Sequence, residues 1–191
     1  DDYRRTLQRL QVETRRLEAL AQSLLLTARS DAGVTDATPL STRGTAEGAV
    51  ARMQPLARSR NIALTCTTDT DAEVLADSAM LEGALVALID NALRFAPPGG
   101  TVDVAARASG NDALLVVSDT GPGFSEAALR DATLRFWRDD PARSGSGSGL
   151  GLAIVRAVAE RHRGTIALRN VTAGSGAVVE LRLPAVHAGR L

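Results

Sequence analysis

The chain has 191 residues, 45% of them apolar, and its 22 basic and 22 acidic residues give a formal net charge of zero. This length suits one full domain with an appendage or two small domains, and the apolar fraction predicts a folded core. The balanced charge and the 3% aromatic content argue against a nucleic-acid-binding module, which needs a basic face and stacking rings. A single cysteine, Cys66, excludes an internal disulfide and a cysteine-based metal cluster.

No stretch approaches the roughly 18 to 20 apolar residues that a membrane-spanning helix needs, and no signal peptide is visible. We therefore expect a soluble, cytoplasmic part of a protein. The chain starts with Asp1 and Asp2 rather than with methionine, which predicts a fragment whose parent protein could be membrane-anchored through an upstream region.

Residues 1–32 are predicted to form one long, coiled-coil-forming helix. Apolar or small residues recur at alternating spacings of three and four, which is a heptad seam: Leu7, Leu10, Thr14, Leu17, Ala21, Leu24 and Ala28. This seam is too apolar for a lone solvated helix, so we expect a partner helix or a homodimer. Residues 33–44 have the composition of a linker, and Gly33 suits the C-terminal cap of the helix.

Residues 45–186 mix helical and strand patterns, and residues 187–191 read as a tail. Helices are expected at 45–60, 77–95, part of 125–135 and 150–162, and strands at 62–67, 101–108, 113–119, 164–170 and 176–184. Asp77 is a candidate N-cap, and residues 109–112 form a candidate hairpin turn. Helices set against a mixed sheet predict an α+β fold, a two-layer sandwich.

The first motif with chemical potential is "LIDNALRFA", which ends a predicted helix. Asn91, Arg94 and Phe95 stand at positions i, i+3 and i+4 and share one helix face. An amide oxygen, a guanidinium group and a ring could serve a metal ion, a phosphate and a flat ligand. A helix with one polar edge would show the same pattern, so this motif alone leaves both interpretations open.

The second motif is "DTGPGF", which follows the apolar run "ALLVV". A carboxylate at the buried end of a strand costs free energy unless it has a partner. Asp119 could accept a hydrogen bond from the amino group of a ligand, and Gly121 and Gly123 would let the backbone approach that ligand closely. By itself, such a short string is a weak signal.

The third motif is "SGSGSGLGLAIV", a glycine-serine segment that runs into a helix near Gly149. A helix N-terminus offers unpaired N–H groups and the positive end of the helix dipole, which together favour phosphate. The pattern is neither a GxGxxG turn after a strand nor a GxxxxGK[ST] loop, which excludes the Rossmann and P-loop classes. A plain linker between two elements is the alternative.

In this order and spacing, the motifs resemble the catalytic and ATP-binding domain of sensor histidine kinases, which belong to the GHKL ATPase superfamily. "LIDNALRFAPPGG" is similar to the N box of that family, "DTGPGF" to its G1 box, "LRFWRDD" to its F box and "GSGLGLAIV" to its G2 box. Residues 1–32 resemble the second helix of the dimerisation and phosphoacceptor hairpin. The resemblance implies ATP and Mg²⁺ as cofactors.

By this resemblance, Asn91 would coordinate the Mg²⁺, and Arg94, where the family usually has lysine, would grip the phosphates. Asp119 would accept a hydrogen bond from the adenine amino group, beside Phe95 and Phe124. The other nucleotide-binding residues implied are the glycines of both loops and two leucines that anchor the last helix: Gly121, Gly123, Gly147, Gly149, Leu150, Gly151 and Leu152. Phe136 would pin the near end of a lid over the nucleotide.

Three positions depart from the family pattern. Ala87 stands one turn before Asn91, where the gyrase and Hsp90 branch has a glutamate that activates water, so a gyrase-like ATPase is not expected. Thr133 replaces the first phenylalanine of the F box. Ala177 replaces a threonine, which removes an expected side-chain hydrogen bond near Asp119.

The resemblance predicts a kinase that transfers the γ-phosphoryl group of ATP to a histidine. That histidine would lie on the first hairpin helix, which is absent from this chain, and a response regulator would be a further partner. His162 is expected to be structural, and His187 to lie in the tail. Three alternatives stay open: half of a split kinase acting in trans, a degenerate nucleotide-binding or dimerisation module and, less favoured, a serine kinase of the anti-sigma-factor type.

Overall fold

The structure is a computed structural model that describes residues 3, 6, 37–138, 149–172 and 175–186. Tyr3 and Thr6 are helical. The rest of the long helix expected over residues 1–32 lies outside the described residues, as do most of the glycine-serine segment with Gly147 and the tail at 187–191.

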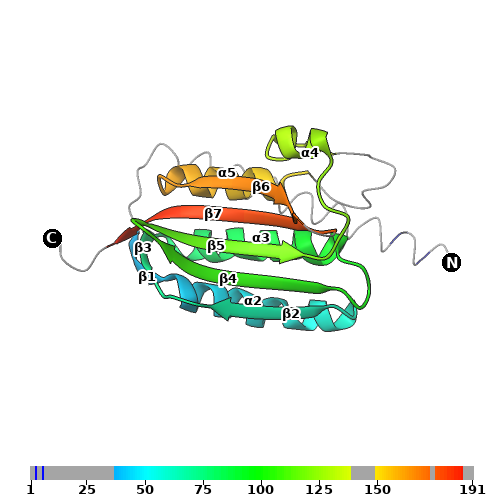
Figure 1. Ribbon diagram of the computed structural model, residues 1–191, viewed down its shortest axis with the longest axis horizontal. Helices are drawn as coiled ribbons and strands as arrows, with labels where there is room; N and C mark the ends of the chain where they lie inside the picture. Colours follow the sequence, from blue (N-terminus) through cyan, green and yellow to red (C-terminus); the bar gives the residue numbers. More distant parts are fainter. Residues whose placement is uncertain (1–2, 4–5, 7–36, 139–148, 173–174, 187–191) are drawn as a thin grey trace.

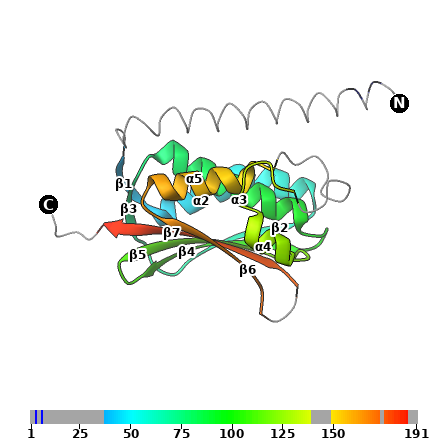
Figure 2. The same cartoon turned by 90° about the horizontal axis from the view of Figure 1, so that it is seen from above.

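The described part of the chain forms a seven-stranded mixed sheet and a layer of helices on one of its faces (Figures 1 and 2). The elements in chain order are β1 (Thr38–Ser41), α2 (Thr42–Ser59), β2 (Ala63–Thr68), β3 (Glu73–Ala76), α3 (Ser78–Phe95), β4 (Thr101–Ser109), β5 (Asp112–Asp119), α4 (Glu126–Asp131), α5 (Gly151–Arg161), β6 (Thr165–Asn170) and β7 (Ala177–Val186). The strands are ordered β1-β3-β7-β5-β4-β2, and β6 also pairs with β7. β2 and β4 are parallel, whereas the other pairs are antiparallel. The α+β sandwich predicted from the sequence is therefore confirmed.

The core lies between the sheet and helices α2, α3 and α5 (Figure 2). Helix α3 lies at its centre, because eight of its residues are buried at helical spacing: Met80, Leu81, Ala84, Leu85, Leu88, Ile89, Ala92 and Leu93. Alternate residues of β7, such as Leu181 and Leu183, are fully buried on the sheet side. Each buried leucine contributes about 1.5–3 kcal/mol, so the packing fixes both ends of α3, including the polar last turn.

The segment expected to be a linker at residues 33–44 contains regular structure, which corrects that prediction. β1 pairs with β3 over four residue pairs, and α2 begins at Thr42 instead of Thr45. Ser41 caps α2, since its hydroxyl accepts from the amide of Gly44, and the same hydroxyl donates to the carboxylate of Asp71. Both β1 and β3 are four residues long, too short to show an alternating pattern, and they are defined by pairing, β1 with β3 and β3 also with β7.

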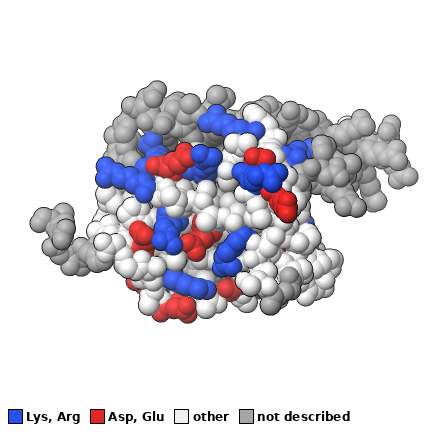
Figure 3. Space-filling view, turned by 45° about the horizontal axis from the view of Figure 1, so that its top comes forward, with Lys and Arg blue, Asp and Glu red and all other residues white. Residues whose placement is uncertain are grey.

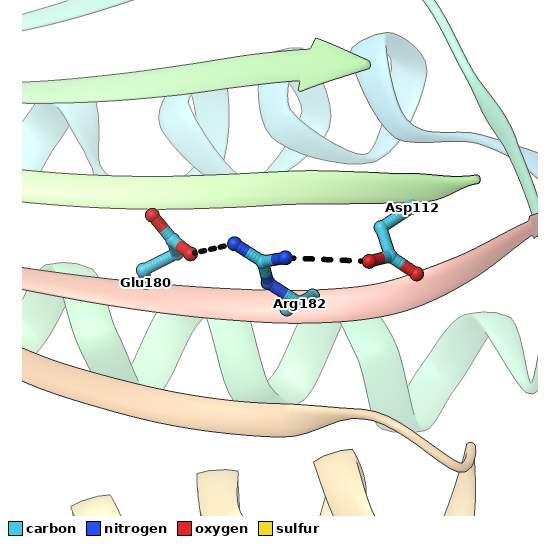
Figure 4. Close-up of polar contacts among 3 residues, drawn as sticks. All are labelled: Asp112, Glu180 and Arg182. Carbon is cyan, nitrogen blue, oxygen red and sulfur yellow. Dashed lines mark hydrogen bonds and ion pairs between the residues drawn. The ribbon is translucent and has the colours of Figure 1, made fainter. Parts of the chain in front are cut away.

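The face of the sheet away from the helices carries charged side chains. Arg182 on β7 bridges Asp112 at 3.4 Å and Glu180 at 3.2 Å (Figure 4). Beside this bridge, Ala105, Val116 and Val178 form a small apolar cluster. In the tilted view of Figure 3, acidic and basic side chains are interspersed over the surface. Such exposed pairs contribute at most about 1 kcal/mol each.

His162, directly after α5, ties that helix to the start of α3. The amide of Asp77 donates to Nε2 at 3.1 Å, and Nδ1 lies 2.7 Å from the carbonyl oxygen of Val158. The ring is only 7% exposed. Because Nε2 accepts, Nδ1 carries the hydrogen and donates to Val158. Asp77 caps α3 through the amide of Met80, as predicted. The structural role predicted for His162 is confirmed.

We predict that His162→Ala lowers the free energy of unfolding by about 1–3 kcal/mol, because the partly buried Asp77 amide loses its acceptor and the buried ring leaves a gap. Urea unfolding followed by circular dichroism measures the effect. His187→Ala removes the other histidine of the chain and serves as the control. Equal unfolding midpoints for the two variants would contradict this role.

Candidate functional site

The "DTGPGF" loop lies directly against the last residue of α3. A Cβ atom added to Gly121 would stand 2.8 Å from the carbonyl oxygen of Phe95 and 2.7 Å from Oδ1 of Asp119. Since real Cβ atoms do not come this close, a glycine is required here. The N-box and G1-box motifs, which sequence reasoning treated separately, therefore meet at one end of the sheet.

Asp119 is the last residue of β5 and is 9% exposed. Its Oδ1 accepts from the amide of Gly121 at 2.8 Å and from the amide of Ala177 at 3.4 Å. Burial raises the pKa of Asp119 and outweighs the two backbone hydrogen bonds, which act to lower it. Both bonds that the described residues make to this carboxylate end on Oδ1, so Oδ2 is the oxygen that can accept from a ligand.

The start of β7 closes the other side of Asp119. A Cβ atom at Gly176 would collide with the carbonyl oxygen of Asp119, so only a glycine lets the two backbones meet. Ala177 lacks the hydroxyl of the family threonine, yet its backbone amide still reaches Asp119. Sequence reasoning considered Ala177 but missed Gly176, because a glycine in a hairpin reads as an ordinary turn.

Asn170 at the end of β6 holds the far end of the loop. Its Oδ1 accepts from the amide of Phe124 at 2.6 Å, and its Nδ2 donates to the carbonyl oxygen of Phe124 at 2.9 Å. Gly123 has φ +82°, which favours glycine. Phe124 itself is half-buried and packs against the core. Sequence reasoning missed Asn170, which ends a strand and matches no motif.

The three N-box residues lie in the last turn of α3, away from its buried stripe. Asn91 is half-buried, and Phe95 is 42% exposed. Arg94 pairs with Asp90 at 3.2 Å. This exposed pair is worth a few tenths of a kcal/mol, so the guanidinium group can leave it at little cost. Ala87, one turn earlier, packs against the core and offers no acid or base.

The described end of the G2 motif forms the start of α5, which packs against α3. Leu150 is 1% exposed, and Leu152 packs against the core, so both anchor the helix as expected. The N-cap residue of α5, Leu150, makes no side-chain cap hydrogen bond, and nothing lies within 4 Å of a Cβ atom added at Gly151. Within the described residues, the first amides of α5 are therefore available to an anion.

Phe136 differs in part from its predicted role in pinning the lid. Its ring is 56% exposed, whereas its backbone amide donates to the carbonyl oxygen of Gly149 at 3.0 Å. Gly149, with φ +70°, packs so tightly on the Phe136–Trp137 backbone that a Cβ atom would stand 2.7 Å from the oxygen of Trp137. The two ends of segment 139–148 are thus joined through backbone contacts, and the expected lid itself lies outside the described residues.

Among the described residues, no group of three or more histidine, cysteine, aspartate or glutamate side chains is placed to hold a metal ion. The candidate metal ligand in the site is the side-chain amide oxygen of Asn91. Mg²⁺ commonly takes one or two protein ligands together with phosphate oxygens and water. The residues present therefore fit a metal that arrives with a phosphate ligand.

Residues 76–187, more than half of the chain, match the family of histidine kinase-, DNA gyrase B- and HSP90-like ATPases. The chain belongs to this family. Its motifs place it among the sensor histidine kinases, as an ATP-binding catalytic domain. In the described part of this kinase domain, no helix combines the length and apolarity that crossing a bilayer requires.

The relatives of this histidine kinase domain are sensor proteins. The chain is 38% identical over 170 residues to the sensor protein IrlS of Burkholderia pseudomallei, covering 86% of this chain and 36% of that protein. It is 35% identical over 191 residues to the sensor protein SphS of Synechococcus elongatus, covering 92% and 45%. It therefore spans less than half the length of these relatives.

Solved structures agree with this assignment. The mycobacterial sensor histidine kinase MprB superposes with a TM-score of 0.66 at 30% identity, covering 78% of this chain and 97% of that one. Full-length ShkA, solved with AMPPNP, gives a TM-score of 0.78 at 25% identity, covering 100% and 40%.

The raised pKa of Asp119 predicts a pH dependence of stability. The folded state holds the proton more tightly than the unfolded state, so stability falls as pH rises from 3.8, the ordinary value, through the raised one. Asp119→Asn keeps an oxygen for both amides but cannot ionise. We predict that the free energy of unfolding of Asp119→Asn, minus that of the wild type, increases as the pH rises from 3.8 to the raised pKa of Asp119. Above the raised pKa this difference should stay constant.

Urea unfolding at a series of pH values measures this difference. Asp69→Asn, which removes an exposed carboxylate that makes one long, solvent-exposed pair of 3.7 Å with Arg107, is the control for the loss of one charge. A wild-type and Asp119→Asn pair whose stabilities run parallel from pH 3 to pH 7 would show that burial does not disfavour the charged carboxylate.

Proposed function

We propose that this domain binds Mg-ATP and transfers the γ-phosphoryl group to a histidine on a helical hairpin. The observation that carries the proposal is Asp119, a buried carboxylate with one oxygen held by two backbone amides and the other left for a ligand. Such an acceptor, fixed beside two glycines, suits an exocyclic amino group. The likeness to sensor histidine kinases supports the same conclusion.

Each remaining residue has a role in this proposal. Asp119 accepts from the adenine amino group through Oδ2, and Phe95 and Phe124 lie beside the base. Asn91 holds Mg²⁺ through its amide oxygen, and the ion, when bound, neutralises charge on the phosphates. Arg94 leaves Asp90 to contact the phosphates, where a guanidinium group can bind two oxygens.

The chemistry would be one of positioning and charge stabilisation. Phosphate oxygens would meet the first amides of α5, which begins at Gly151 just after Gly149. Gly147, also expected to bind phosphate, lies outside the described residues. Because Ala87 supplies no base to activate water, the site favours transfer to an acceptor over hydrolysis. The acceptor hairpin, of which residues 1–32 would be the second helix, a response regulator and a helix-mediated dimer are the partners we propose, acting in the cytoplasm.

A degenerate module that does not transfer phosphate is the second candidate, since Ala87, Thr133 and Ala177 depart from the family. Ala177 is weak support for a degenerate module, because its backbone amide still donates to Asp119. A split kinase, whose acceptor helix belongs to another polypeptide, would use the same site in the same way.

We predict that Asp119→Asn weakens ADP and ATP binding about 10- to 100-fold, because a hydrogen bond to a charged group contributes roughly 1.5–3 kcal/mol. The variant also places an amide donor where the adenine amino group donates. Isothermal titration calorimetry measures the affinity, and Asp69→Asn is again the control. Unchanged affinity would remove Asp119 from the base-binding site.

We also predict that the chain alone takes up no acid-labile phosphate from radiolabelled Mg-ATP. When mixed with a polypeptide that carries the complete hairpin and its histidine, it should label that polypeptide, and Asn91→Ala should abolish the labelling. Arg107→Ala, on the far face of the sheet, is the matched control. Labelling of the chain itself would show that the acceptor lies within these 191 residues and not on the supplied hairpin. A bound hairpin that stays unlabelled would favour the degenerate module.

A further inference from the structure

Asn170 reaches across from β6 to the loop that follows β5. The two segments are 46 residues apart in the chain, and one side-chain amide makes both contacts with the backbone of Phe124. It accepts from the amide and donates to the carbonyl group, as a neighbouring strand would. Two opposed hydrogen bonds from one planar group fix the orientation of the peptide as well as its distance.

The amide of Asn170 also lies against Gly123. A Cβ atom at Gly123 would stand 2.8 Å from Oδ1 of Asn170 and 3.1 Å from its Cγ. A side chain at position 123 would therefore push Asn170 off the loop. The resemblance explains Gly123 by the room that a base needs, but the structure supplies a second reason, which is the close approach of Asn170.

The partner of Asn170 in the β6–β7 ladder is Ala177. Ala177 donates to Oδ1 of Asp119, while Asn170 bonds to Phe124. One cross-strand pair thus holds both ends of the loop 119–124. The amide of Val171 donates to the carbonyl oxygen of Gly176 at 3.0 Å, which closes the hairpin directly behind this pair.

We propose that Asn170 is a positioning residue for base recognition, which, with Ala177, clamps the loop 119–124 so that Asp119 is already oriented for the adenine amino group. In this role Asn170 acts through the loop and not by contact with the ligand. The inference rests on the proposed function, since it assumes that Asp119 reads the base. The Asn170 side chain is exposed, so water can replace its bonds in the free protein, and loss of the clamp should affect binding more than folding.

The test compares two nucleotides that differ at the group Asp119 would read. ADP carries an exocyclic amino group, whereas inosine diphosphate carries a carbonyl oxygen there. We expect Asn170→Ala in the full chain to weaken ADP binding about 5- to 50-fold. The preference for ADP over inosine diphosphate should fall with it, and the urea unfolding midpoint should stay close to wild type. Competition against a fluorescent ADP analogue measures both affinities.

Asn170→Asp is the sharpest variant, because it keeps the size of the side chain. It retains the acceptor for the Phe124 amide but turns a carboxylate oxygen toward the Phe124 carbonyl group. We expect it to bind ADP as weakly as Asn170→Ala does. Arg169→Ala, an exposed neighbour on the same strand, is the control and should bind like wild type.

Two outcomes would overturn the inference: Asn170→Ala or Asn170→Asp binding ADP like wild type, or both nucleotides losing affinity in the same proportion. An equal loss for both nucleotides would mean that Asn170 stabilises the whole binding site and does not orient Asp119 toward the amino group of the base. Failure of the wild-type chain to bind ADP would instead reject the proposed function, so the two failures are distinguishable. In a transfer assay with a supplied hairpin, KM for ATP should rise while kcat stays unchanged, because the base contributes equally to the ground and transition states.

Discussion

A carboxylate buried at the end of a strand is the constraint on which this site depends. Burial alone would push Asp119 toward its neutral form, and the amides of Gly121 and Ala177 offset part of that cost. Bringing those amides to one oxygen forces two backbones close together, which requires glycine at 121 and at 176. The glycines of "DTGPGF" are therefore needed to stabilise the buried carboxylate of Asp119. The same absence of side chains leaves room for a ligand beside it.

Much of the fold could be predicted because its central elements are long and periodic. Helix α3 shows eight buried residues at helical spacing and an N-cap at Asp77, and the β4–β5 hairpin joins two long runs rich in apolar residues. β1 and β3 escaped prediction because four residues show no period, and each becomes a strand only by pairing, β1 with β3 and β3 with both β1 and β7. The start of α2 was set three residues late for the same reason: its cap, Ser41, is the last residue of β1 and bonds to Asp71, thirty residues away.

The candidate site divides in the same way. Residues that carry the chemistry sit in contiguous motifs, so Asn91, Arg94 and Asp119 could be named from the sequence. Asn170 and Gly176 could not, because their contribution is a backbone contact with a distant segment. No residue type signals such a contact in advance. The role of Phe136 was only partly predicted, since its contact with Gly149 is made by its backbone amide, while its ring is largely exposed.

The two halves of the site differ in how firmly the protein holds them. The end that we propose for the base is fixed by ladder bonds, close-packed glycines and buried hydrogen bonds around Asp119. The end that we propose for the phosphates has Arg94, whose partner within the described residues is the exposed Asp90, and the start of α5, whose N-cap residue makes no side-chain cap hydrogen bond. A rigid base site supplies binding energy without motion, whereas weakly held cationic and amide groups can follow the phosphates. This division suits transfer to an acceptor that arrives from another element, because the donor phosphate must adjust to it while the nucleotide stays bound.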